Sequence, residues 1–264
     1  MSALYLQGAG VLGPGLPDWP AARRVLSGEQ TYQYGPPPQP NPDALPPTER
    51  RRGAKTVRWT VAVAQEALQG TDIRPAEVAS VFASSSGDGE TLHRICETLA
   101  TPERDVSPTH FHNSVHNAAA GYWSIAAGSR LPSVSLCGHD VSFAVGLIEA
   151  TAQVQSGTAP VLLVTYDLPY PQPLLAVRSI AEPLAVAVLL SREPRSCTLA
   201  RWTVSLARGA VAIRLPEMLR PEFATNPAAH ALPLLAAVAR RSVETVPVPY
   251  VDGCHLRVES SPWP

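Results

Sequence analysis

Length, composition and charge limit what this chain can be. It has 264 residues, of which 45% are hydrophobic and 16% are charged, and its formal net charge is −1 at pH 7. This composition is that of a folded globular protein and excludes a disordered one. A nearly neutral chain has no electrostatic reason to bind nucleic acid or an anionic membrane, so we predict neither as a partner.

The sequence shows no targeting, membrane or disulfide pattern. Met1–Gly13 lacks the basic start and continuous apolar core of a secretory signal. No stretch approaches the roughly 18 apolar residues that a transmembrane helix needs. Neither a disulfide framework nor a thiolate metal site is expected, because no CxxC spacing occurs among Cys96, Cys137, Cys197 and Cys254. We therefore expect a cytoplasmic protein without a metal or other cofactor.

The first quarter of the chain predicts a strand, a loop and a long helix. A short apolar strand at Leu4–Gln7 ends at Gly8-Ala9-Gly10, and seven prolines between Gly35 and Pro47 require an extended surface loop. The segment Glu49–Leu68 is expected to be one helix that ends at Gly70. Its buried face follows from the spacing of Val57, Val61, Ala64 and Leu68.

The rest of the chain alternates between the two element types. Leu184–Leu190 is continuously apolar, as in a strand covered on both faces. The alternation predicts an α/β layered fold, with parallel strands on either side of the helix after Cys137. Further strands are expected at Val78–Ser84, Val134–Cys137, Pro160–Tyr166, Arg201–Ala207 and His255–Glu259, and helices at Thr91–Leu99, Asn113–Ala127, Ser142–Gln155 and Ala231–Val243.

The segment from Val106 to Gly157 resembles the active-site region of the β-ketoacyl synthase family. The helix-rich stretch before the nucleophile is matched by Ser107-Pro108, Asn117, Ala120-Gly121, Ile125 and Gly128. Pro132–Ser135 resembles the strand that delivers the catalytic cysteine, and Ser142–Gly157 the helix that begins beneath it. The resemblance implies a truncated thiolase-like fold in a single domain, 1–264. Residues 1–191 would form the family's N-terminal half and 192–264 a short C-terminal extension.

The nucleophile of the family is missing from this resemblance. Aligned without gaps, the position of the catalytic cysteine falls on Asp140. A carboxylate is a poorer nucleophile than a thiolate, and the mixed anhydride formed by its attack would hydrolyse. The family's C-terminal half, with two histidines and a lysine, is also missing. Only His230 and His255 follow Ser191, and neither has a matching context. The resemblance therefore implies a relative that does not itself condense.

Short length and the phrase FHNSVHNAAAGYWSI resemble the compact chain-length-factor-like subunits of aryl polyene and xanthomonadin-type biosynthesis. Chain length factors commonly carry glutamine at the nucleophile position, so Asp140 is a further departure. The resemblance implies a non-catalytic subunit that pairs with an active ketosynthase and shapes the tunnel for the growing chain. An acyl carrier protein is a second candidate partner. The partner interface or tunnel is expected to include Phe111, His112, Asn113, His116, Asn117, Tyr122, Trp123, Ser135 and Cys137.

Other residues of the chain leave further chemistries open. An acyl-transferring or decarboxylating enzyme could use Cys137, or the group His110, His112 and His116, whose spacing would also suit zinc. Three further patterns are explained at least as well without a ligand as with one. Gly8–Gly13 matches GxGxxG, but the prolines after it prevent the helix that a dinucleotide site needs. Ser84–Gly89 is read as a turn, and Arg50–Arg52 as a solvated helix start or a phosphate contact.

Overall fold

The computed structural model describes residues 2–157 and 159–264, in which eight strands form one mixed sheet. The strands are β1 (Ser2–Leu12), β2 (Ala79–Ala83), β3 (Ser133–Leu136), β4 (Val161–Asp167), β5 (Leu184–Ser191), β6 (Ala200–Arg208), β7 (Glu244–Pro249) and β8 (Cys254–Pro262). Their order is β3-β2-β4-β5-β1-β6-β8-β7. The neighbours β3, β2 and β4 run parallel, as predicted, and all other pairs are antiparallel.

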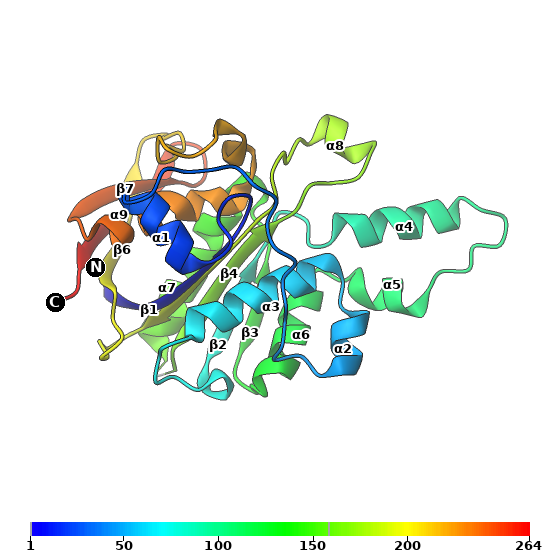
Figure 1. Cartoon of the computed structure of the whole chain (residues 1–264), viewed down its shortest axis with the longest axis horizontal. Helices are drawn as coiled ribbons and strands as arrows, with labels where there is room; N and C mark the ends of the chain where they lie inside the picture. Colours follow the sequence, from blue (N-terminus) through cyan, green and yellow to red (C-terminus); the bar gives the residue numbers. More distant parts are fainter. Residues whose placement is uncertain (1, 158) are drawn as a thin grey trace.

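Helices cover both faces of this sheet, which gives the predicted α/β thiolase-like layers (Figure 1). They are α1 (Trp19–Ser27), α2 (Pro47–Arg52), α3 (Lys55–Leu68), α4 (Gly89–Leu99), α5 (Pro108–Asn113), α6 (Ala118–Ala127), α7 (Ser142–Ser156), α8 (Leu174–Val177) and α9 (Leu232–Arg240). One core joins α3 and α6 to one face of the sheet, and a second joins α1, α7 and α9 to the other. No helix in the described residues has the length and apolarity that crossing a membrane requires.

Two glycines of the GxGxxG match lie inside β1, which is longer than predicted. A Cβ atom on Gly8 would lie 2.1 Å from the Ala67 carbonyl oxygen, and one on Gly10 would lie 2.2 Å from that of Val63. Both carbonyls belong to α3, so these positions lack side chains in order that the helix can rest directly on the strand. The motif therefore serves helix–strand packing, and no helix begins within it.

Two predicted helices are interrupted in the structure. The single helix expected over 49–68 is α2 followed by α3, because Gly53 has an extended ψ of 130°. Within α3 the predicted apolar face is confirmed, since Val57, Val61 and Ala64 are completely buried. The helix expected over 113–127 is likewise divided into the end of α5 and α6. The apolar positions that predicted the first helix all lie in α3, and α2 buries no residue, so the apolar spacing does not reveal that break.

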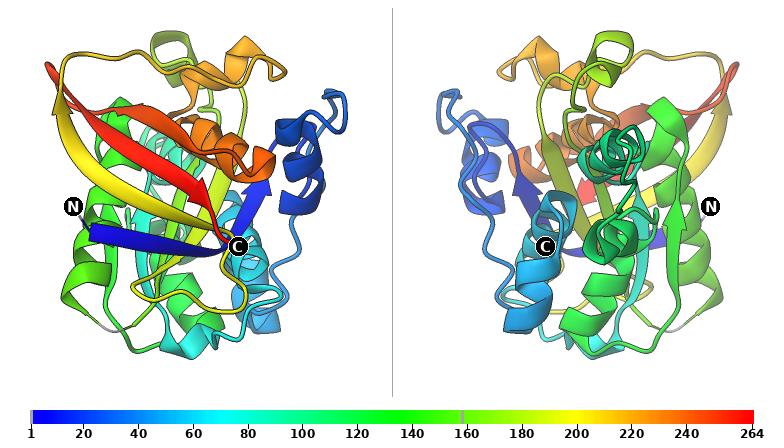
Figure 2. Two further views of the ribbon diagram at one scale, coloured as in Figure 1. Left: turned by 90° about the vertical axis from the view of Figure 1, so that its left-hand side faces the viewer. Right: turned by 90° about the vertical axis from the view of Figure 1, so that its right-hand side faces the viewer.

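The C-terminal extension continues the sheet and covers α7. Strand β6 pairs with β1, β8 with β6, and β7 with β8, so the sheet grows beyond the strands of the predicted N-terminal half (Figure 2). Helix α9 and the preceding 3-10 turn η4 (Pro227–Ala231) share one core with α1 and α7. Among the elements that the sequence analysis missed are α1 and β7. Helix α1 has an Asp18 N-cap, a proline in its first turn and Gly28 at its C-cap, and β7 contains two prolines.

Strand β7 forms one edge of the sheet, and its prolines remove hydrogen-bond donors from that edge. Pro247 and Pro249 lie two residues apart, so both turn their backbone toward the same side. Proline has no N–H and cannot donate a hydrogen bond to β8. The side of β7 to which both prolines turn must therefore be the open edge. Only Thr245 then offers an outward N–H from this strand. Edges modified in this way resist pairing with another chain.

The double substitution Pro247→Thr/Pro249→Thr should promote self-association, because it adds two outward N–H donors to the β7 edge. Light scattering after size exclusion should show the apparent mass of the variant rising with concentration. The wild type and a Pro102→Thr control, changed in an exposed turn, should show no such rise. A variant that behaves like the wild type would show that the prolines do not protect this edge.

Candidate functional site at the head of helix α7

The carboxyl ends of the three parallel strands meet at the amino end of α7, where ligands of α/β folds usually bind. A 3-10 turn, η2 (His139–Val141), joins β3 to α7, which begins at Ser142. Asp140 therefore lies at the head of the buried helix, at the place where the sequence analysis put it. His139 beside it has a positive φ of 53°, which marks a tight turn.

An arginine from the connection between β4 and β5 holds Asp140. Arg178 Nη2 donates to Asp140 Oδ1 at 2.9 Å, and Nη1 lies 2.8 Å from His139 Nε2. His139 Nδ1 lies 3.2 Å from the other carboxylate oxygen, so the three side chains form a closed ring of contacts. The Asp140 side chain is 68% exposed, which keeps the energy of this ion pair small. Its geometric effect is to place a guanidinium group at the head of α7.

His230 reaches the same place from the C-terminal extension, although its sequence context gave no reason to expect it. It is 8% exposed and lines a cavity of about 410 Å³ together with His139, Asp140 and Arg178. Burial lowers the pKa of His230 to about 4, so the ring is neutral at pH 7. Its Nδ1 atom has no hydrogen-bond partner in the described chain. The site thus contains a neutral imidazole, an ion pair and no thiol at the helix head.

Cys137 is exposed and lies three residues before Asp140. Its Sγ atom donates to the Ser85 carbonyl oxygen at 3.1 Å. This contact holds the thiol against the end of β2. A carbonyl oxygen is not a general base that could deprotonate the thiol. Cys137, His139 and Asp140 are the residue types of a catalytic triad with a nucleophile, a base and an orienting acid. In this structure they do not form one.

A buried polar cluster that the sequence analysis missed joins the ends of β2 and β4. Asp167 Oδ1 accepts hydrogen bonds from Ser84 Oγ at 3.0 Å, Ser85 N at 2.9 Å and Ser85 Oγ at 2.7 Å. Tyr170 Oη lies 3.3 Å from Ser85 Oγ. Asp167 is 1% exposed, and burial raises its pKa to about 6 although the serine bonds act against this. The available signal was an acidic residue directly after the apolar run Val161–Val164.

Replacing Asp167 with Asn should stabilise the protein at neutral pH. The raised pKa means that folding favours the protonated carboxyl, so its contribution is lost as pH rises from about 4 to about 6. Asp167→Asn keeps an acceptor for the two serines and removes the buried charge. Its Tm should exceed that of the wild type by about 2–4 °C at pH 7.5 and match it near pH 4. Exposed Asp105→Asn serves as the control, and a lower Tm for Asp167→Asn at pH 7.5 would contradict this account.

The three histidines proposed as a metal or catalytic group point to different neighbours. His110 faces a cleft beside α2 and α3, and the His112 ring packs edge-on against Tyr122 with centroids 5.7 Å apart. His116 Nε2 lies 3.3 Å from the Ser84 carbonyl oxygen. Within the described residues no three His, Cys, Asp or Glu side chains are arranged to hold a metal ion.

The residues expected at a partner interface divide into two sets. Asn113, Tyr122 and Trp123 are at most 3% exposed and pack inside the subunit, and their place at an interface or tunnel stays a prediction. Helix α6 packs against α3 and the sheet, and its aromatic residues enter the core between them. The remaining set is exposed or half-buried and stays a prediction: Phe111, His112, His116, Asn117, Ser135 and Cys137.

The sequence matches the family model described as "Beta-ketoacyl synthase, N-terminal domain" over residues 25–242. A comparison with curated proteins gave no match. Solved structures with similar folds are more informative about architecture. A chain from "Ketosynthase (ApeO) in Complex with its Chain Length Factor (ApeC) from Xenorhabdus doucetiae" has a TM-score of 0.70 at 23% identity, with 98% of this chain and 100% of that chain covered.

Two further solved structures agree in fold at lower identity. "The ishigamide ketosynthase/chain length factor" has a TM-score of 0.72 at 11% identity and covers 100% of both chains. A chain from "AntDE:AntF (apo): type II PKS acyl-carrier protein in complex with its ketosynthase bound to the hexaketide" has a TM-score of 0.75 at 12% identity and covers 99% of each chain. The family match over 25–242 and these thiolase-type folds agree, and the chain belongs to the β-ketoacyl synthase family.

Proposed function

We propose that the chain is a non-catalytic, chain-length-factor-like subunit that pairs with an active β-ketoacyl synthase. The observation that carries this proposal is the Asp140–Arg178 ion pair at the head of α7, where a condensing enzyme needs a thiol. Matches to chains from two ketosynthase and chain length factor complexes support the same class of partner. Residues 1–264 would act as one domain in the cytoplasm, without a cofactor.

Strand β3 is the second edge of the sheet, and its backbone is open. The carbonyl oxygens of Pro132 and Leu136 accept from Ser80 N and Ser84 N of β2. Because these positions alternate, the N–H and C=O groups of Ser133 and Ser135 turn to the outer side. No proline, charge or bulge lies within Ser133–Leu136 to protect this edge. The β3 edge is therefore the route by which a second sheet can join.

Exposed apolar side chains lie near this open edge. Leu131 before β3 is 38% exposed, and Ile125 of α6, which packs beside β3, is 52% exposed. Phe111 and Val115, next to α6 in the chain, are 68% and 48% exposed. Figure 1 shows α4 and α5 extending from the body on the side of α6. Apolar surface around an unpaired strand is what a stable protein–protein interface buries.

The finer parts of the proposal concern the product and the second partner. The exposed and half-buried members of the predicted set, Phe111, His116 and Cys137 among them, would line the shared tunnel or its rim. The phrase FHNSVHNAAAGYWSI favours the aryl polyene and xanthomonadin-type subunits, as the sequence resemblance implies. An acyl carrier protein would visit the complex, in line with the similarity to a ketosynthase structure that includes an acyl-carrier protein.

Proline at position 135 should weaken the partner complex. Ser135→Pro removes one outward N–H from β3 and leaves the bonds of Pro132 and Leu136 to β2 in place. The affinity for the co-expressed ketosynthase should fall about fivefold to tenfold, as expected for one lost hydrogen bond with added crowding. Thr245→Pro makes the same change on the outward side of β7 and should leave the affinity unchanged. Equal affinities for wild type and Ser135→Pro would show that β3 is not part of the interface.

The silent-subunit proposal is tested on the purified complex with its ketosynthase. After incubation with acyl carrier thioesters, mass spectrometry should find the acyl adduct on the ketosynthase and none on this chain. Cys137→Ser should leave product formation by the complex unchanged. Loss of turnover in Cys137→Ser, with the complex still assembled, would support the alternative of an acyl-transferring enzyme that uses Cys137.

A further inference from the structure

The hairpin of α4 and α5, residues 89–113, has little support from the rest of the molecule, and we call it the arm. It extends away from the sheet in Figure 1, and neither helix contributes a residue to the two hydrophobic cores. Only Thr91 is buried in α4 and only Asn113 in α5. Segments with so few buried contacts have low local stability, so the arm can move without unfolding the body.

Polar contacts attach the arm to the body at its two ends. At the start of α4, Asp88 accepts a hydrogen bond from Thr56 Oγ1 in the first turn of α3 at 2.6 Å. At the end of α5, Asn113 Nδ2 donates to the Arg52 carbonyl oxygen at 2.8 Å. Gly87, just before Asp88, has a positive φ of 71°. These contacts fix where the arm begins and ends, as at a hinge, and do not fix its angle to the body.

Open volume lies on both sides of the arm. On one side a cleft of about 640 Å³ separates it from α2 and α3. On the other side a groove of about 360 Å³ separates α4 from Pro169, Tyr170 and Pro171. Tyr170 touches the arm at Gly89, which lies beside the hinge. Along the cleft and the groove the arm is thus separated from both neighbours, and a swing toward α2 and α3 would close the larger space.

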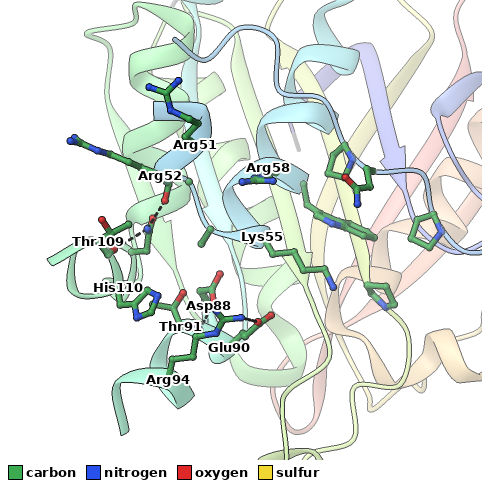
Figure 3. Close-up of a pocket in the computed structure, with 18 of the residues that line it drawn as sticks. Arg51, Arg52, Lys55, Arg58, Asp88, Glu90, Thr91, Arg94, Thr109 and His110 are labelled. Atoms are coloured by element: carbon green, nitrogen blue, oxygen red, sulfur yellow. Dashed lines mark hydrogen bonds and ion pairs between the residues drawn. The ribbon is translucent and has the colours of Figure 1, made fainter. Parts of the chain in front are cut away.

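The wall of the cleft that faces the arm is basic. Figure 3 shows Arg51 and Arg52 on α2 and Lys55 and Arg58 on α3. Their side chains diverge, so they present a charged surface and do not converge on one small anion. None of the four forms an ion pair with another side chain of residues 2–157 and 159–264. A negative charge brought to this wall would therefore meet cations that have no partner.

The arm carries the complementary charge. Residues 89–113 have a formal net charge of −2, from Glu90, Glu97, Glu103 and Asp105 against Arg94 and Arg104. Glu90 lines the cleft and pairs with Arg94 on the same helix. Both side chains of this pair are about half exposed, so the pair stabilises the present arrangement only weakly. An exchange of Arg94 for a cation of the wall therefore costs little.

We propose that the arm closes onto the wall formed by α2 and α3, and that the cleft belongs to the open form of this conformational device. In the closed form the Glu90 carboxylate pairs with Lys55 or Arg58 in place of Arg94. Because each exposed ion pair contributes little, the two forms differ little in free energy and both are populated. Closure also moves the exposed apolar side chains that the arm carries. Neither form requires a partner or a ligand, so closure is independent of the proposed function.

The test is a distance measurement on the whole chain by pulsed electron paramagnetic resonance. One spin label is placed on Cys96, an exposed cysteine of α4, and one on Thr48→Cys in α2, with the other three cysteines changed to serine. Low salt should give two distances. The shorter one should disappear at about 1 M salt, where the screening length falls to about 3 Å. A single distance that salt does not change would overturn the proposal.

Charge reversal identifies the contact that holds the closed form. Glu90→Lys should reduce the population at the shorter distance at least about fivefold, and Lys55→Glu/Arg58→Glu should do the same. The combined variant should restore this population, because opposite charges then face each other again. Glu97→Lys, on the groove side of α4, is the control and should keep the wild-type populations. A combined variant that stays open, or a control that loses the shorter distance as Glu90→Lys does, would overturn the proposal.

Discussion

The burial of α7 is the constraint on which the rest of the structure depends. The helix lies so close to the sheet that a Cβ atom on Gly146 would come within 2.8 Å of both Ala83 Cβ and Leu163 Cδ1. Its other side is covered by η4, which lies in one core with α9. This packing fixes where α7 begins, and with it the position of Asp140. It also brings His230 and the Arg178 connection to the same cavity.

Much of the architecture was predictable because it follows from the spacing of residues that are close together in the sequence. The apolar runs of β4 and β5, the buried face of α3 and the strand–turn–helix around Asp140 follow from spacing and from the family resemblance. The break at Gly53 and the burial of Tyr122 and Trp123 could not be read in this way, since each depends on contacts with distant segments. Strand β7 was missed because prolines, which argue against a central strand, are acceptable at an edge.

The same distinction applies to the sites. Asp140 could be placed from its neighbours in sequence, but Arg178 and His230 join it from 38 and 90 residues further along the chain. Asp167 meets Ser84 and Ser85 only because β4 lies beside β2 in the sheet. The cations of α2 were visible as the basic run Arg50–Arg52. Whether that run was solvated or lined a cavity depended on where α4 and α5 lie.

The two ends of the sheet differ in a way that limits assembly. One end carries proline residues and the other has free backbone groups, so strand addition has a single available direction. A molecule with only one open edge has no free edge left after one partner has paired with it. A complex formed through the proposed β3 interface would therefore have a closed stoichiometry, and growth into an open-ended filament would not be available by this route.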